Sequence, residues 1–121
     1  MKMLFVFEKS RALRFIGHLD LQRTMQRALR RSGLPASYSQ GFNPHIILSF
    51  AAPLSVGIPG EREIAEIPLA LPVSPADFMH RMEKALPKGL VAVEAIPLPD
   101  DAPAAMARGF AAQYAFSKRE G

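Results

Sequence analysis

The segment Asp20–Pro35, DLQRTMQRALRRSGLP, predicts an amphipathic helix that ends within the segment itself. Its apolar residues follow the spacing i, i+4, i+7, i+8 of one helix face: Leu21, Met25, Ala28 and Leu29. Gly33 suits the left-handed position that ends many helices, and Pro35 prevents continuation. The segment therefore predicts a helix that begins near Asp20 and packs on a core through one face.

A second face of this helix carries positive charge. Arg23, Arg27 and Arg30 follow the spacing i, i+4, i+7, and Arg31 extends the charge at the helix end, where cations suit the helix dipole. Residues 1–60 hold eight of the 15 Lys and Arg against two acidic residues, a balance of +6, whereas the second half has seven basic and nine acidic residues, or −2. This pattern predicts one of two things: a polyanion partner, of which nucleic acid is the first candidate, or a helix face that is simply solvated.

A polar and aromatic loop, YSQGFNPH at residues 38–45, follows the helix and has the glycine and Asn-Pro of a turn. Phe42 in this loop is available either for packing or for stacking on a base. The helix, the segment before it and the loop supply the candidate binding residues: Arg14, His18, Arg23, Arg27, Arg30, Arg31, Tyr38, Gln40, Gly41, Phe42, Asn43 and His45.

Three residues of this region are weak catalytic candidates: His18, Tyr38 and His45. A His–His or His–Tyr pair could perform general acid–base chemistry, as in metal-independent RNA cleavage, but isolated loop histidines more often have structural roles. Their spacing is not that of zinc ligands, so we expect no metal site. Asp20 is interpreted as a helix cap or a first-turn acid. The sequence thus favours a binding protein over an enzyme.

Outside this region the clearest strand is residues 2–8, with Leu4 and Val6 on one face and Phe5 and Phe7 on the other. Because both faces are apolar, we expect either a central strand or a sheet that is covered on each side. Further extended segments are predicted at 13–16, 46–50, 62–71 and 90–96.

A second helix is predicted from its start signals. Ser74 fits the N-cap, Pro75 the first helical position and Asp77 an approximate capping box. Its apolar stripe is Phe78, Met82 and Ala85.

The element order over residues 1–98 is β-α-β-β-α-β, which predicts a ferredoxin-like α+β domain. Such a domain has an antiparallel sheet with two helices on one face, and we expect the other face to be free for binding. Residues 99–121 are predicted to be a proline-rich linker and the start of an incomplete following unit, with a helical turn at 104–107 and a strand from 113.

The composition narrows the class of protein. The chain has 121 residues, enough for one domain, and no cysteine, which excludes disulfides and thiolate-bound clusters within it. No apolar run approaches the ~20 residues of a membrane span, and the first residues do not resemble a signal peptide. We therefore expect a cytoplasmic protein without membrane contact.

Four blocks of the sequence, in this order, carry a resemblance to a known family: Leu13–Leu21, Arg27–Pro35, Tyr38–Pro44 and Leu48–Gly57. They resemble the radical SAM-linked domain of unknown function (DUF2344), which occurs in bacteria alone or fused behind a radical SAM domain. The resemblance covers about residues 2–116 and implies the N-terminal part of a longer, two-part protein.

This resemblance implies a partner rather than a reaction, because the family has no established activity and hence no catalytic residues to transfer. The implied partner is a radical SAM protein that carries an iron–sulfur cluster and S-adenosylmethionine. The cluster is assigned to that partner because this chain has no cysteine to hold it. Three hypotheses follow: an accessory domain that binds RNA or another anionic substrate, a module that docks on the radical SAM partner, and an endoribonuclease-like protein.

Overall fold

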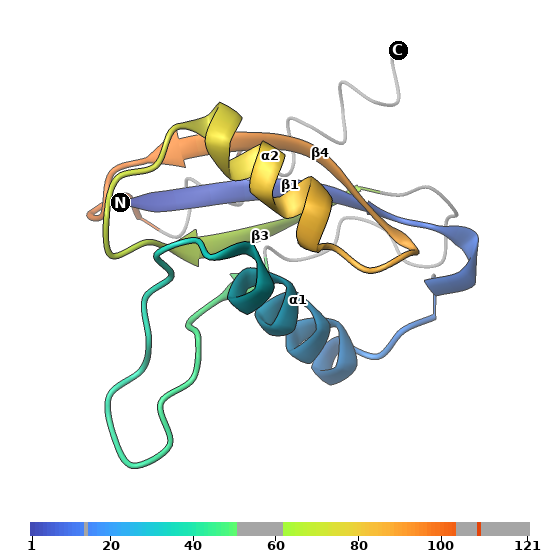
Figure 1. Cartoon of the computed structure of the whole chain (residues 1–121), viewed down its shortest axis with the longest axis horizontal. Helices are drawn as coiled ribbons and strands as arrows, with labels where there is room; N and C mark the ends of the chain where they lie inside the picture. The colour runs from blue at the N-terminus through green and yellow to red at the C-terminus, as the bar shows by residue number, and fades with distance from the viewer. Residues whose placement is uncertain (14, 51–61, 104–108, 110–121) are drawn as a thin grey trace.

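The chain forms a four-stranded antiparallel sheet with two helices (Figure 1). The computed structural model describes residues 1–13, 15–50, 62–103 and 109. Its elements in chain order are β1 (Lys2–Lys9), the 3₁₀ turn η1 (Arg11–Leu13), α1 (His18–Ser32), β2 (Ser49–Phe50), β3 (Arg62–Pro68), α2 (Pro75–Ala85) and β4 (Leu90–Leu98).

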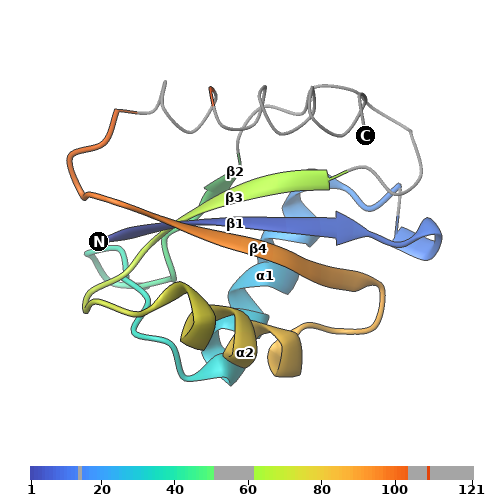
Figure 2. The same ribbon diagram turned by 90° about the horizontal axis from the view of Figure 1, so that it is seen from above.

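The sheet has the strand order β2-β3-β1-β4, and every neighbouring pair is antiparallel. β1 is central: its Phe5 is paired with Ala65 of β3 on one side and with Ala95 of β4 on the other. Both helices lie on the same face of the sheet (Figure 2). This arrangement confirms the predicted ferredoxin-like α+β fold.

The core follows the alternation of β1. Phe5 and Phe7 point to the helix side, where the Phe5 ring lies 5.5 Å from that of Phe78 on α2. Leu4 and Val6 point to the opposite side and join a second buried cluster with Ile64, Leu98 and Ala102. The expectation that this opposite face is free for binding is wrong at its centre, because Leu4 and Val6 have no exposed surface.

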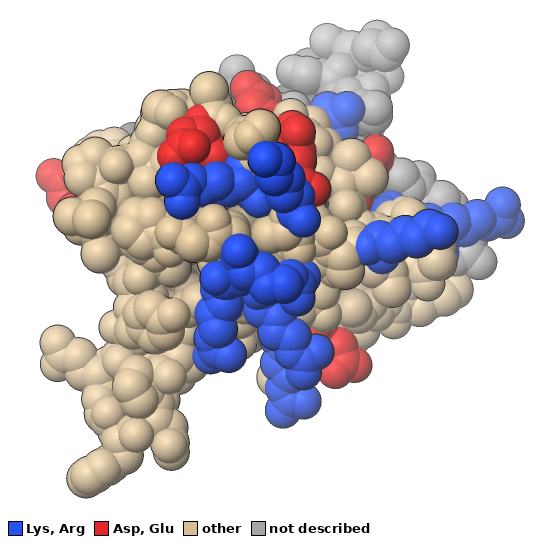
Figure 3. All heavy atoms as spheres, in the orientation of Figure 1, with Lys and Arg blue, Asp and Glu red and all other residues tan. Residues whose placement is uncertain are grey.

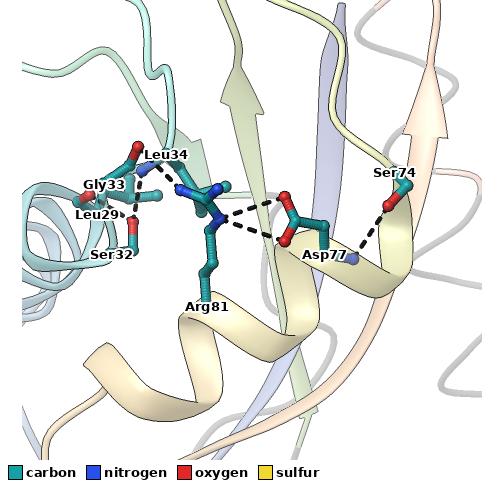
Figure 4. Close-up of polar contacts among 7 residues, drawn as sticks. All are labelled: Leu29, Ser32, Gly33, Leu34, Ser74, Asp77 and Arg81. Carbon is teal, nitrogen blue, oxygen red and sulfur yellow. Dashed lines mark hydrogen bonds and ion pairs between the residues drawn. The ribbon is translucent and has the colours of Figure 1, made fainter.

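The helix ends show how local sequence sets the boundaries. At α2, the Ser74 Oγ accepts a hydrogen bond of 3.1 Å from the Asp77 N–H, as the capping signals predict (Figure 4). α1 ends at Gly33, whose φ of 73° is left-handed. However, α1 begins at His18 with Gly17 as N-cap, so Asp20 is a first-turn acid and not the cap.

Two predictions around α1 are corrected. Among the described residues of the extended segment expected at 13–16, none lies in a strand: Leu13 belongs to η1, where its N–H donates to the Ser10 carbonyl at 3.0 Å. The strand expected at 46–50 joins the sheet only as β2, because Ile46 pairs with Tyr38 of its own loop instead.

Two other strands have shifted ends. β3 stops at Pro68, short of the predicted residue 71, because proline supplies no N–H to a ladder. β4 continues past the predicted residue 96 to Leu98, since at the edge of the sheet Pro97 is tolerated. The sequence also predicts a loop at 51–60 from its prolines and glycines. This loop and the predictions for 104–107 and 113–117 lie outside the described residues. Within the described ranges, no helix is long and apolar enough to cross a membrane.

Candidate functional site

α1 separates its apolar and charged residues as the sequence predicts. Its buried residues, among them Leu21 and Met25, face the core, whereas Arg23, Arg27 and Arg30 are exposed. We call these three arginines the arginine face. In the space-filling view, Lys and Arg atoms gather over α1 (Figure 3). In the part of the chain that the structure describes, no carboxylate forms an ion pair with any of the three.

Arg31 differs from the arginine face because its guanidinium has an internal partner. Its Nη2 and Nε donate to the carbonyl oxygen of Ala85, the last residue of α2, at 2.6 and 3.2 Å. In return, Arg81 of α2 donates to the Gly33 carbonyl at 3.3 Å (Figure 4). Arg31 therefore holds the two helices together. Arg14, another candidate, lies outside the described residues.

The second part of the candidate site is the loop between α1 and β2, which projects away from the sheet (Figure 1). We call residues 38–46 the projecting loop. Its two arms meet where Tyr38 pairs with Ile46 and where the Ser39 N–H donates to the His45 carbonyl at 2.8 Å. The His45 N–H donates in turn to the Ser39 Oγ at 3.1 Å.

Most side chains of the projecting loop are open to solvent, whereas Ile46 at its base is buried. Phe42 is 104% exposed and Tyr38 51%, and Gln40, Asn43 and His45 are exposed as well. Of the two roles predicted for Phe42, packing within the chain is thus wrong. The loop is fixed to α1 by Gln26, whose Nε2 donates to the Ile46 carbonyl at 2.9 Å. Gln26 lies three residues after Arg23 and four before Arg30, so these side chains share one face of α1, and the loop is joined to that face.

The structure gives the two histidine candidates different neighbours. His18 begins α1, and its ring lies edge-on to Phe50 with the ring centroids 5.4 Å apart. The His45 Nδ1 lies 3.0 Å from the Ser39 Oγ, so this imidazole helps to close the projecting loop. Among the described residues, no three His, Asp or Glu side chains gather as metal ligands would. The described part of this region thus presents positive charge on α1 and exposed aromatic rings on the loop.

Sequence reasoning named the residues of the loop but missed its form. A signal was present: residues 32–60 contain no Lys, Arg, Asp or Glu, directly after the arginine-rich helix. A segment with several Gly, Pro, Ser and Asn residues between periodic segments is typical of a loop. Whether it packs on the protein or projects from it depends on partners distant in sequence, such as Gln26.

The sequence of this chain matches one known protein family. No curated protein and no solved structure matches the chain. The sequence model of one family, described as "Uncharacterized protein conserved in bacteria (DUF2344)", matches residues 2–121. That match spans nearly the whole chain, and the chain therefore belongs to the DUF2344 family of conserved bacterial proteins.

Proposed function

We propose that this domain is a non-catalytic accessory protein that binds RNA, or a similar polyanion, on behalf of a radical SAM partner. The observation that carries the proposal is the arginine face: three exposed guanidinium groups without a carboxylate partner in the described part of the chain. Exposed arginines of this kind neutralise phosphates and release their counterions, which provides affinity without sequence preference.

The position of the arginines supports this reading over that of a solvated helix face. Asp20 is the only acidic residue of α1, so the helix offers almost no internal charge compensation. The exposed aromatics Tyr38 and Phe42 stand on the adjoining loop. Proteins that bind single-stranded nucleic acids commonly combine cations with exposed aromatic rings.

Fluorescence anisotropy with a labelled RNA, titrated with the full chain at increasing salt, tests the proposal. Three phosphate contacts on a single strand predict a log–log slope of about −2. The triple variant Arg23→Ala, Arg27→Ala, Arg30→Ala should bind about tenfold more weakly at low salt and show a flatter slope, since each exposed contact contributes about 0.5 kcal/mol.

A matched control removes the same charge elsewhere. Arg11, Lys84 and Lys88 are exposed cations outside α1, and their joint replacement by alanine also lowers the net charge by three. The proposal expects this control to keep most of the affinity. Equal losses in both triple variants would mean that only net charge matters, and absence of RNA binding at low salt would refute the proposal.

The radical SAM partner is the second half of the proposal. It rests on the family resemblance of the four sequence blocks, and the iron–sulfur cluster and S-adenosylmethionine would belong to that partner because this chain has no cysteine. Co-purification of the chain with a radical SAM protein encoded beside it tests this half. Incubation of labelled RNA with the chain in EDTA tests the absence of catalysis: cleaved RNA would overturn it and favour the endoribonuclease hypothesis.

A further inference from the structure

The tip of the projecting loop exposes an aromatic ring without any cover. Phe42 has the full accessibility of an unfolded residue, 104%, whereas Phe5, Phe7 and Phe78 are completely buried. A single exposed apolar residue is common on protein surfaces and by itself requires no explanation. Phe42 is different because the segment that carries it is held in place by several polar contacts.

The neck of the loop is closed by four hydrogen bonds. The Ser39 N–H and the His45 carbonyl form one at 2.8 Å, and the Ser39 Oγ contacts both the His45 N–H at 3.1 Å and the Nδ1 at 3.0 Å. The Ile47 N–H donates to the Ser37 carbonyl at 2.9 Å. These bonds leave residues 40–44 as a short tip, in which Gly41 has a φ of 125° that other residues rarely adopt. A tip held in this way loses little conformational entropy when it binds.

The tip and the arginine face offer different kinds of contact: the tip offers an aromatic ring and amides, and the arginine face offers positive charge. The loop contains no Lys, Arg, Asp or Glu, so it adds no fixed positive charge for phosphates. It offers instead an aromatic ring and the exposed amides of Gln40 and Asn43, which can donate to and accept from base edges. The cations are on α1, which the Gln26–Ile46 hydrogen bond joins to the loop.

We propose that residues 40–44 form a stacking site for an unpaired base, so that the ligand of this domain is single-stranded RNA and not duplex RNA. Phe42 stacks on the base, and the arginine face holds phosphates of the neighbouring nucleotides. In a duplex the bases are already stacked on one another, and an aromatic tip has no free base face to contact. This inference rests on the proposed function and adds the strand type and the residue that recognises it.

The test uses three anionic probes and one reporter. The probes are a labelled oligouridine of about twelve nucleotides, its duplex with oligoadenosine, and inorganic polyphosphate, which has no bases. The reporter is Phe42→Trp, because the chain has no tryptophan of its own. Val91→Trp is the matched control, since Val91 is 54% exposed and lies on β4, at the sheet edge opposite β2.

The expected results follow from stacking. Oligouridine quenches the fluorescence of Phe42→Trp, whereas the duplex and polyphosphate do not, and Val91→Trp responds to none of the three. Phe42→Ala weakens oligouridine binding about 5- to 150-fold, the range seen when a base loses its aromatic partner. The same variant leaves duplex and polyphosphate affinities unchanged, because these probes contact the arginine face alone.

Each other outcome overturns the inference in a recognisable way. If oligouridine binds and the triple arginine variant loses it, but Phe42→Trp and Phe42→Ala report no change, the stacking site is refuted while the proposed function stands. If no probe binds at low salt, both are refuted. If Phe42→Ala instead abolishes co-purification with the radical SAM protein and leaves RNA affinity intact, the tip docks a protein.

Discussion

The guanidinium of Arg31, in the last turn of α1, donates two hydrogen bonds to the carbonyl oxygen of Ala85, the last residue of α2. Arg81 of α2 donates to the carbonyl of Gly33, the residue that ends α1. The final carbonyls of a helix lack partners within that helix, and positive charge there also suits the helix dipole. Each helix is therefore capped by an arginine of the other.

Arg31→Ala should lower the free energy of unfolding by about 1–2 kcal/mol, because it removes two charge-assisted hydrogen bonds across the helix pair. Urea unfolding measures this as a lower midpoint with an unchanged slope. Arg30→Ala is the matched control: Arg30 is exposed on the same turn, so the change should stay within about 0.5 kcal/mol. Equal effects of the two substitutions would show that the contact with Ala85 contributes nothing to stability.

This pair of arginines also marks where prediction from the sequence ends. The spacing of residues 20–35 was enough to predict the helix, its buried face and its end at Gly33, because these depend on local periodicity and backbone conformation. Arg23, Arg27 and Arg31 are chemically alike in the sequence. Only packing against α2 gives the Arg31 guanidinium an internal hydrogen-bond partner, the carbonyl of Ala85, which lies 54 residues away in the sequence.

The central strand and the second helix could also be predicted from local sequence signals, whereas the ends of the outer strands could not. The alternation of β1 and the capping signals at Ser74 are local, and both are confirmed. The ends of β2 and β4 depend on pairing with other strands: Ile46 pairs with Tyr38, and Pro97 is tolerated because β4 is an edge. The exposure of Phe42 likewise depends on how the loop is held.

Gly17→Ser should stabilise the protein by about 0.5–1 kcal/mol. Gly17 is the N-cap of α1 with an extended backbone, φ −67° and ψ 154°, and no side-chain cap. A Cβ at this position meets nothing within 4 Å, while serine can accept a hydrogen bond from the first turn and restricts the unfolded chain. Thermal unfolding should show a higher midpoint.

The control for this change is Gly33→Ser, at the other end of the same helix. Its φ of 73° is unfavourable for a residue with a Cβ, so the same substitution should destabilise by about 1 kcal/mol. If both variants shift stability in the same direction, the backbone conformations assigned to the two helix ends are wrong.

Phe78→Ala should cost about 3–5 kcal/mol, a large share of the stability of a small domain. The Phe78 side chain is completely buried and lies edge-on to Phe5. Circular dichroism during urea unfolding should show a much earlier transition. Phe42→Ala removes the same atoms from an exposed site and should change stability by less than about 0.5 kcal/mol, which also qualifies it as a folded variant for binding studies.

Ser39→Ala should loosen the projecting loop without unfolding the domain. The substitution removes the hydroxyl that accepts the His45 N–H, so amide hydrogen exchange at His45 should become about fivefold faster, the equivalent of about 1 kcal/mol. The Leu86 amide, which donates to the Met82 carbonyl at the end of α2, is the internal reference and should exchange as before.

Because a looser tip must be ordered on binding, the same variant should weaken oligouridine binding while leaving polyphosphate binding unchanged. Unchanged exchange at His45 would show that the Ser39 hydroxyl does not hold the neck.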